Sequence, residues 1–435
     1  MSHRVAPDST SQTALVIHPD AAFGGARRHP DERLEEAVRL AEALDLEVVR
    51  ARIMTLRRAA PSTRLGAGQV QEIAESCALF GCDVVVVDDA LTAVQQRNLE
   101  RAWGAKVLDR TGLVLEIFAR RARSGEGRLQ VELARLEYER SRLVRTWTHL
   151  ERQRGGFGFL GGPGETQIEA DRRLLNERIV KLKADLGTVK RTRELQRRGR
   201  RRTPFPIVAL VGYTNAGKSS IFNSLTAAGV VAQDMLFATL DPTFRKIGLP
   251  GGRDAIISDT VGFVSDLPHE LVEAFRATLD EVREADLILH VRDIASPSSE
   301  SQRADVLKVL AQIDAGEGSG KAIVEVWNKS DLVSPEEVGE LQALSLRRGA
   351  AMVSARTGQG LEGLIEIINS RLNDHPEMAL TLRIDDGEGL AWLYRHGRVI
   401  AREDGGDRVR VRARLDMKAL NRFVQIRPDA LMASP

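Results

Sequence analysis

Cysteine is almost absent from this 435-residue chain, which contains only Cys77 and Cys82. Two cysteines five residues apart, with no further cysteine and no clustered histidine, cannot supply the ligands of a zinc site. The pattern favours two buried or half-buried free thiols in a reducing compartment, and hence a cytoplasmic location.

Long apolar runs are missing as well. No stretch approaches the roughly 20 residues that a membrane-spanning helix needs, so no membrane insertion is expected. The first residues, MSHRVAPDSTSQ, lack the apolar core of a signal peptide. A hydrophobic content of 43% is ample for packed cores, and the length predicts two to four domains.

One segment matches the phosphate-loop pattern G-x-x-x-x-G-K-[ST]. It consists of Gly212, Tyr213, Thr214, Asn215, Ala216, Gly217, Lys218 and Ser219. The segment follows an apolar run, 205–211, and precedes a helical stretch, 220–228, so that backbone N–H groups converge at a helix start. Lys218 is expected to reach the phosphates and Ser219 to bind Mg²⁺, whereas the alternative is a glycine-rich turn that binds nothing.

Three further motifs follow in order, each after a strand-like run (255–258, 322–327 and 350–353). They are Asp259, Thr260, Val261 and Gly262; Asn328, Lys329, Ser330 and Asp331; and Ser354, Ala355 and Arg356. Asp259 is expected to hold Mg²⁺ through water, Gly262 to donate to a γ-phosphate, and Asp331 to accept from N1 and N2 of guanine. Asn328 and Lys329 would brace the base and the phosphate loop. The four motifs at these spacings resemble the translation-factor-type GTPases.

Basic residues gather in two tracts although the net charge is only +2. The first contains Arg120, Arg121, Arg123, Arg128, Arg135, Arg140, Arg142, Arg145, Arg152 and Arg154, interleaved with Glu126, Glu132, Glu137 and Glu139. The second contains Arg197, Arg198, Arg200, Arg201 and Arg202, with no acid among them. The first tract fits a polyanionic partner and a solvated helix face equally well, whereas the second favours nucleic acid.

Four domains are predicted: 12–110, 111–202, 203–372 and 377–435. The first alternates strands (13–18, 46–49, 84–87, 106–108) with helices (31–44, 94–103), which indicates a small α/β domain. It has no phosphate loop, and the glycine turn 65–69 is interpreted as a plain helix entry in preference to a phosphate site. The last domain is predicted as α+β, with a strand at 379–384, a helix at 387–394 and a hairpin at 399–415.

Residues 111–202 carry the apolar spacing of two long helices. Leu129, Leu133, Leu136 and Leu143 form one seam, and Ile168, Leu175, Ile179, Leu182, Leu186 and Val189 form the other. We expect an antiparallel helical hairpin with arms of about 22 residues, or roughly 33 Å. Its glycine-rich loop, 153–165, contains Phe157, Phe159 and Leu160 beside arginines, which favours contact with RNA over a flexible linker.

The expected fold class is therefore α/β multidomain. A P-loop GTPase domain with a doubly wound sheet is preceded by a small α/β domain and a long antiparallel helical hairpin, and is followed by a small α+β tail domain.

The segments 146–156 and 162–169 resemble the helical-domain signature of the HflX GTPases. The segments 236–243 and 267–279 resemble their switch I and the helix after switch II, and the resemblance runs from about residue 13 to about 372. It implies a Mg²⁺-dependent cytoplasmic GTPase that binds GTP and GDP, acts as a monomer, and contacts the large ribosomal subunit and its rRNA. It further implies that the tip loop reaches toward the peptidyl transferase centre, and that the protein splits and rescues stalled or hibernating ribosomes under stress.

By the same matching, switch I comprises Phe237, Ala238, Thr239, Leu240 and Asp241. Thr239 is the preferred second Mg²⁺ ligand beside Ser219, with Thr243 as another candidate. Asn215 resembles the asparagine of potassium-activated GTPases, where K⁺ binds, although it also suits a tight turn. Phe263 occupies the position where related GTPases carry a water-orienting glutamine. Because an aromatic ring cannot orient water by hydrogen bonding, intrinsic hydrolysis is expected to be slow; the alternative is that Phe263 is only a core residue. No residue is assigned as catalytic.

Two alternative functions are compatible with these motifs. One is a GTPase in ribosome assembly or RNA modification that uses the hairpin to bind RNA. The other is an RNA-remodelling protein with an ATP-using N-terminal domain, which the lack of a second phosphate loop disfavours.

Overall fold

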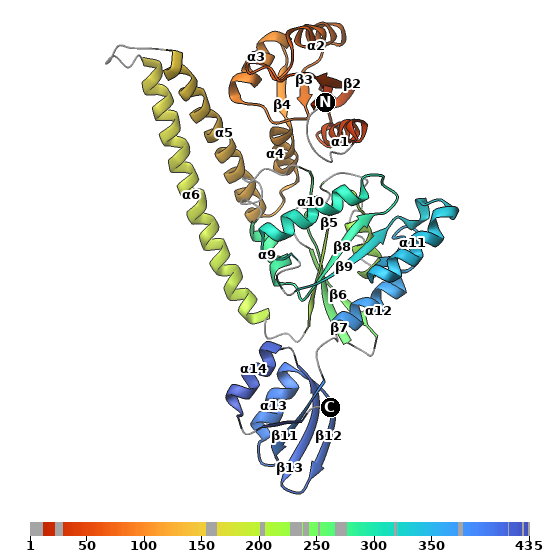
Figure 1. Cartoon of the computed structure of the whole chain (residues 1–435). Coiled ribbons are helices and arrows are strands. Elements are labelled where there is room, and N and C mark those ends of the chain that lie inside the picture. Colours follow the sequence, from red (N-terminus) through yellow and green to blue (C-terminus); the bar gives the residue numbers. More distant parts are fainter. Residues whose placement is uncertain are drawn as a thin grey trace, which may run out of the picture.

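The computed structural model describes residues 12–21, 29–153, 163–200, 205–226, 237, 243–250, 253–265, 276–316, 319, 321–372, 377–415, 417–428 and 430–433. An α/β domain, a long helical hairpin, a GTPase-type domain and a small terminal domain follow one another along the chain (Figure 1). Among these residues, no helix combines the length and apolarity needed to cross a bilayer.

The N-terminal domain is a parallel sheet in the order β2-β1-β3-β4. Its strands are β1 (Thr13–Ala21), β2 (Glu47–Leu56), β3 (Val84–Val87) and β4 (Lys106–Asp109). Helix α1 (Pro30–Glu42) covers one face, and α2 (Ala67–Phe80) and α3 (Ala93–Trp103) cover the other. The predicted strand at 46–49 was too short, because β2 lies at the sheet edge and its exposed polar residues break the apolar run.

The glycine turn at 65–69 is a helix entry, as predicted. Gly66 is the N-cap residue of α2, and the backbone N–H of Gly66 donates to Oε1 of Gln69 at 3.1 Å. Cys77 and Cys82 are buried free thiols. Burial, followed by the neighbouring Cys82, raises the pKa of Cys77 to about 12, so this thiol is protonated and unreactive at neutral pH.

The hairpin consists of α5 (Gly125–Gln153) and α6 (Pro163–Arg200), preceded by the separate helix α4 (Arg110–Arg121). The central part of the predicted seam is present: Leu133, Leu136, Ile179 and Leu182 are buried between the arms, flanked by Leu129, Leu175 and Leu186. Val189 is half-buried outside this cluster, and the side chains of Leu143 and Ile168 lie outside the described residues. Two ion pairs also join the arms, Glu132 with Arg178 at 2.6 Å and Glu137 with Lys183 at 2.8 Å. The tip residues 154–162 lie outside the described residues.

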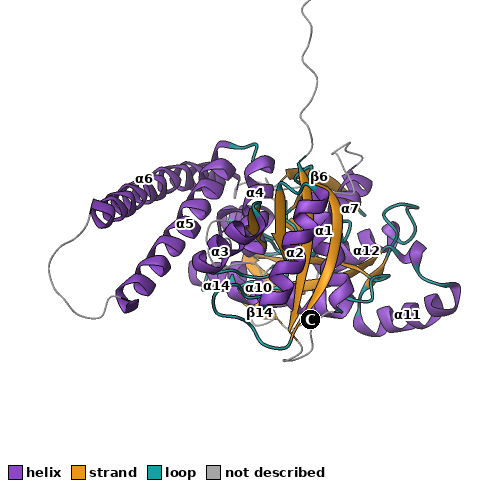
Figure 2. Cartoon of the chain, turned by 90° about the horizontal axis from the view of Figure 1, so that it is seen from above, coloured by secondary structure: helices purple, strands orange, loops and turns teal. Residues whose placement is uncertain are grey.

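The arms are longer than predicted, at 29 and 38 residues, or about 44 and 57 Å. The helices continue through polar turns beyond the apolar seam, and a count of seam positions could not detect those turns. Seen from above, the hairpin projects sideways from the rest of the molecule (Figure 2).

The GTPase-type domain contains a six-stranded sheet in the order β10-β9-β8-β5-β7-β6. Its strands are β5 (Ile207–Gly212), β6 (Thr243–Leu249), β7 (Arg253–Asp259), β8 (Leu287–Asp293), β9 (Ala322–Asn328) and β10 (Ala351–Met352). The edge strand β6 pairs antiparallel with β7, so the sheet is mixed, which the sequence did not predict. Helices α9 (Arg276–Glu284) and α10 (Ser299–Gln312) pack on one face, and α7 (Lys218–Thr226) and α12 (Leu361–Leu372) on the other; α11 (Pro335–Arg348) precedes β10.

One hydrophobic core runs through the N-terminal domain, the base of the hairpin and the GTPase-type domain. It includes Leu40 of α1, Val114 and Phe118 of α4, Val131 of α5, and Val309 of α10. These three parts therefore pack as one unit, with α4 between the two sheets (Figure 1).

The terminal domain has an antiparallel sheet in the order β12-β13-β11-β14. The predicted strand, helix and hairpin are present as β11 (Glu377–Arg383), α13 (Gly387–His396), β12 (Arg398–Gly405) and β13 (Arg408–Arg414). The hairpin turns at Gly406, whose φ of 56° favours glycine. Helix α14 (Met417–Ile426) and strand β14 (Leu431–Ala433) were not predicted.

Candidate functional site

The phosphate loop connects β5 to α7 and is shaped by two glycines. A Cβ on Gly212 would lie 2.2 Å from the carbonyl oxygen of Val291, and one on Gly217 (φ +90°) would lie 2.1 Å from Nδ2 of Asn328. Asn215 also has a positive φ, 61°, which fits the tight-turn interpretation. The loop ends where α7 begins, at Lys218, so an anion held by the loop would lie at the N-terminus of this helix.

Lys218 lies under this loop with only 6% of its surface exposed. Its ammonium group donates to the carbonyl oxygens of Tyr213 at 2.9 Å and Gly212 at 3.2 Å. Burial lowers the pKa of Lys218 to about 8, against the opposing effect of Asp259. The lysine is thus held beside the loop, and an anion bound there would raise its pKa again.

Two oxygen ligands suited to Mg²⁺ lie beside Lys218. The hydroxyl of Ser219 donates to the carboxylate of Asp259 at 2.7 Å, and Asp259 is fully buried at the end of β7. Mg²⁺ prefers one or two protein oxygens together with phosphates and water, and this pair fits that preference. The structure describes no cluster of three or more His, Cys, Asp or Glu side chains that could hold a metal by itself. The other predicted ligand, Thr239, lies outside the described residues.

The segment after Asp259 lies against the phosphate loop. A Cβ on Gly262 would lie 2.9 Å from Cγ2 of Thr214 and 3.0 Å from Nζ of Lys218, so only glycine allows this approach. The backbone N–H of Phe263 donates to Gly212 at 3.1 Å, and its carbonyl accepts from Thr214 at 2.7 Å. The Phe263 ring is 2% exposed and packs in the shared core, so it cannot orient a water at the phosphates.

The third and fourth motifs meet beside the same loop. Asn328 donates to the carbonyl of Ala216 at 2.9 Å and accepts from the N–H of Ala355 at 3.0 Å, so it joins the phosphate loop to 354–356. The hydroxyl of Ser354 donates to Asp331 at 2.7 Å. Lys329 pairs with Asp293 at 2.7 Å, a partner that the sequence analysis missed, although an acid at the carboxyl end of an apolar strand was a usable signal.

The structure therefore brings together the predicted residues at 212–219, 259–262, 328–331 and 354–356. Of the switch I residues, Phe237 is described and packs edge-on against Phe118, with ring centroids 4.6 Å apart. Ala238, Leu240 and Asp241 lie outside the described residues, as Thr239 does. The assignments to phosphate, Mg²⁺, K⁺ and guanine stay predictions.

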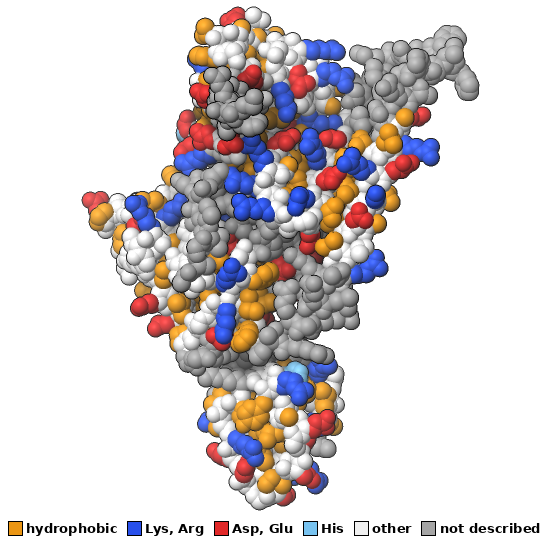
Figure 3. Space-filling model, turned by 180° about the vertical axis from the view of Figure 1, so that it is seen from behind, with side chains coloured by type: hydrophobic (Ala, Val, Ile, Leu, Met, Phe, Trp, Pro, Cys, Tyr) orange, Lys and Arg blue, Asp and Glu red, His pale blue; other side chains and the backbone are white. Residues whose placement is uncertain are grey.

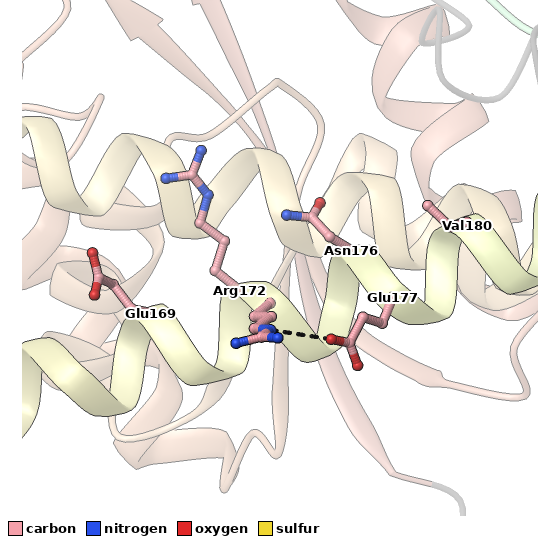
Figure 4. Close-up of a pocket in the computed structure, with 6 residues that line it drawn as sticks. Glu169, Arg172, Asn176, Glu177 and Val180 are labelled. Atoms are coloured by element: carbon pink, nitrogen blue, oxygen red, sulfur yellow. Dashed lines mark hydrogen bonds and ion pairs between the residues drawn. The ribbon is translucent and has the colours of Figure 1, made fainter.

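Among the described side chains of the first predicted basic tract, arginines pair with acids and do not form a stripe of one sign. Arg120 pairs with Asp45 at 2.6 Å and Arg142 with Asp109 at 2.5 Å, and Figure 3 shows acidic side chains among the basic ones along the hairpin. A hollow of about 540 Å³ on α6 is lined by Glu169, Arg172, Arg173, Asn176, Glu177 and Val180 (Figure 4). Arg173 donates to Glu177 there at 3.2 Å. The hollow is lined by two arginines and two glutamates, so its charges are largely balanced. Side chains of the second tract lie outside the description.

A mixed α/β sheet with a phosphate loop after one strand, a buried lysine under that loop and an acid at the end of the next strand defines a P-loop nucleotide-binding protein. The Asn-Lys-x-Asp segment beside that loop is typical of guanine-nucleotide binders within this class.

Comparisons with known proteins agree with that class. Three family models match: "GTP-binding GTPase N-terminal" over residues 31–119, "GTP-binding GTPase Middle Region" over 121–200, and "50S ribosome-binding GTPase" over 207–329. The chain is 49% identical to "GTPase HflX" of Magnetococcus marinus over 86% of each chain. It is 45% identical to "GTPase HflX" of Escherichia coli, over 82% of this chain and 83% of that relative.

Among solved structures, the chain is similar to one titled "crystal structure of SsGBP and GDP complex", at 26% identity and a TM-score of 0.49. The match covers 82% of this chain and 98% of the other. From the extent of the sequence matches, the chain belongs to the HflX family of GTPases, and the predicted family and enzyme class are confirmed.

Proposed function

We propose that this protein is a Mg²⁺-dependent GTPase that binds the large ribosomal subunit and separates the subunits of stalled or hibernating ribosomes under stress. The observation that carries the proposal is a helical hairpin with arms of about 44 and 57 Å that projects from a GTPase-type domain and shares its core. The match to the family described as 50S ribosome-binding GTPase supports the choice of partner. We further propose that the protein acts as a monomer in the cytoplasm.

Hydrolysis needs the γ-phosphate to be held while its charge is neutralised. We assign the phosphates to the loop amides and to Lys218, and Mg²⁺ to Ser219, Thr239 and, through water, Asp259. Mg²⁺ would supply charge neutralisation at the phosphate oxygens. The backbone N–H of Gly262, which lies against Lys218, would donate to the γ-phosphate.

Phe263 leaves this site without a side chain that orients water at the usual position. GTP turnover by the protein alone is therefore expected to be slow and to rise sharply with large subunits. A partner group that stabilises transition-state charge is worth about 10³-fold or more in this chemistry. Fast turnover that ribosomes do not change would contradict the assignment.

Sedimentation of intact ribosomes with the protein and either GTP or a non-hydrolysable analogue tests the function. Release of free subunits supports splitting. Binding to large subunits without any release favours the alternative, a GTPase in ribosome assembly or RNA modification.

The tip loop supplies a matched variant for this experiment. Changing Phe157 and Phe159 to Ala should weaken splitting by roughly tenfold to several hundredfold if both rings stack on RNA bases, at about 1–3 kcal/mol each. GTP affinity should be unchanged. Reversing the charge of Arg152 and Arg154 should also weaken binding and make its salt dependence shallower. Full splitting by the aromatic variant would leave the hairpin as a spacer.

A further inference from the structure

A buried polar network joins the phosphate loop to the N-terminal domain. The hydroxyl of Tyr213 donates to Glu36 of α1 at 2.6 Å and accepts from the backbone N–H of Ser265 at 2.8 Å. Arg110, the first residue of α4, donates to Glu36 at 3.0 Å and to the Ser265 hydroxyl at 2.8 Å. Four residues from four separate segments of the chain thus close one ring of hydrogen bonds.

The N-terminal domain holds its half of this network in place. Arg110 is 5% exposed and also pairs with Asp88, which follows β3. Asp88 bonds His18 of β1 at 2.8 Å and lies 3.5 Å from Arg33 of α1. Burial alone would raise the pKa of Asp88, but Arg110 and the hydrogen bond from His18 lower it to about 2. The carboxylate therefore stays ionised and anchors Arg110 at neutral pH.

The other half of the network lies in the segment that follows Gly262, whose amide was assigned above to the γ-phosphate. Ser265 is three residues beyond Gly262, and both its backbone groups are used: the N–H bonds Tyr213 and the carbonyl oxygen accepts from Arg110 at 3.2 and 3.3 Å. Between them, the backbone of Phe263 pairs with Gly212 and Thr214. The segment 262–265 is thus fixed to the phosphate loop on one side and to the N-terminal domain on the other.

We propose that Tyr213, Glu36 and Arg110 are positioning residues for GTP hydrolysis, which hold 262–265 where the Gly262 amide meets the γ-phosphate. The N-terminal domain is then a working part of the GTPase site. This inference rests on the proposed hydrolysis. The polar network is not needed merely to hold the domains together, because the shared apolar core already does so. The network differs from that core in that the Tyr213 hydroxyl bonds the backbone of Ser265 directly.

The test uses Tyr213→Phe, which keeps the ring and removes the hydroxyl, together with Glu36→Gln and the double variant in the full chain. Tyr138→Phe is the matched control, since that half-buried hydroxyl donates to Asp109 at 2.5 Å and not to the backbone of 262–265. Single-turnover GTP hydrolysis, affinities for GDP and a non-hydrolysable GTP analogue, and thermal unfolding are measured for each.

Loss of one buried hydrogen bond that acts in the transition state corresponds to about tenfold in rate. We expect Tyr213→Phe to lower hydrolysis by about that factor and to lower affinity for the GTP analogue several-fold, with GDP affinity within about twofold. The double variant should be little worse than either single one, because the two residues act through one contact. Tyr138→Phe should hydrolyse GTP at the wild-type rate.

Three results would overturn the positioning role: a wild-type or faster rate in Tyr213→Phe, equal loss of affinity for both nucleotides, or effects that multiply in the double variant. If Tyr213→Phe unfolds at a lower temperature than the wild-type protein, the hydrolysis rate and the nucleotide affinities of Glu36→Gln test the same role. A wild-type chain without any GTP turnover would instead refute the proposed function, so the two failures are distinguishable.

Discussion

Nucleotide binding should be coupled to protonation of Lys218. This lysine is buried beneath the phosphate loop, and burial lowers its pKa to about 8 from the ordinary 10.5, against the opposing effect of Asp259. Bound phosphates add negative charge beside the buried ammonium group, and they return the pKa toward or above its ordinary value. Binding therefore takes up a proton in any solution where free Lys218 is partly neutral.

The size of the effect follows from the lowered pKa. The neutral fraction of free Lys218 is about one-tenth at pH 7 and about three-quarters at pH 8.5, and the proton uptake on binding equals that fraction. Because only the charged form binds phosphates well, affinity for Mg-GDP should fall as pH rises. The loss is about twofold at pH 8 and about tenfold at pH 9, relative to neutral pH.

Calorimetric titration with Mg-GDP, in two buffers of different ionisation enthalpy, measures the proton uptake directly. Lys218→Arg is the control, since its guanidinium stays charged throughout this range and its binding should show no uptake. Zero uptake by the wild-type protein near pH 8.5, with unchanged affinity, would refute the argument. That result would mean that Lys218 is fully charged before nucleotide arrives.

Three other changes have defined outcomes. Asp331→Asn should weaken GTP and favour xanthosine nucleotides in a competition assay, because the acceptor for guanine N1 and N2 becomes a mixed donor and acceptor. Asn328→Ala should weaken guanine and xanthine nucleotides alike, by roughly fivefold to a hundredfold for two lost hydrogen bonds, and an altered base preference would contradict the bracing role. Burial lowers the pKa of His290 to about 4, so its neutral form should contribute about 3 kcal/mol of stability that is lost between pH 6.5 and 4 in urea titrations, and His290→Leu should remove that part of the loss.

Local sequence determines much of the nucleotide site. The glycines at 212 and 217 leave room that no Cβ could share, and Asn328 fills the space over Gly217. These contacts join segments that the chain order of the sheet brings to one edge. The motifs and their spacing therefore indicated which segments would meet, but not the steric limits at the two glycines. The buried seam of the hairpin was predictable for the same reason, since its period depends on helix geometry alone.

Contacts between domains left no such pattern. Tyr213 and Glu36 are 177 residues apart, and neither lies in a periodic apolar run that would indicate a partner. Phe263 was recognisable as an unusual residue, but sequence alone could not separate a switch role from burial. In the structure, the Phe263 side chain is buried, and the Phe263 backbone is hydrogen-bonded to the phosphate loop. The antiparallel edge strand β6 and helix α14 likewise depend on tertiary packing.

Helix α4 is the element through which the nucleotide site meets the hairpin. Its first residue, Arg110, bonds Ser265, and near its other end Phe118 packs on Phe237, two residues before Thr239. Its buried face continues into the same core as Val131 and Ala134 of α5. Because α5 is about 44 Å long, a rotation of only about 5° at its base moves its far end by about 4 Å. A small rotation of α4 and the base of α5 is therefore geometrically sufficient to displace the far end of α5 by several ångströms.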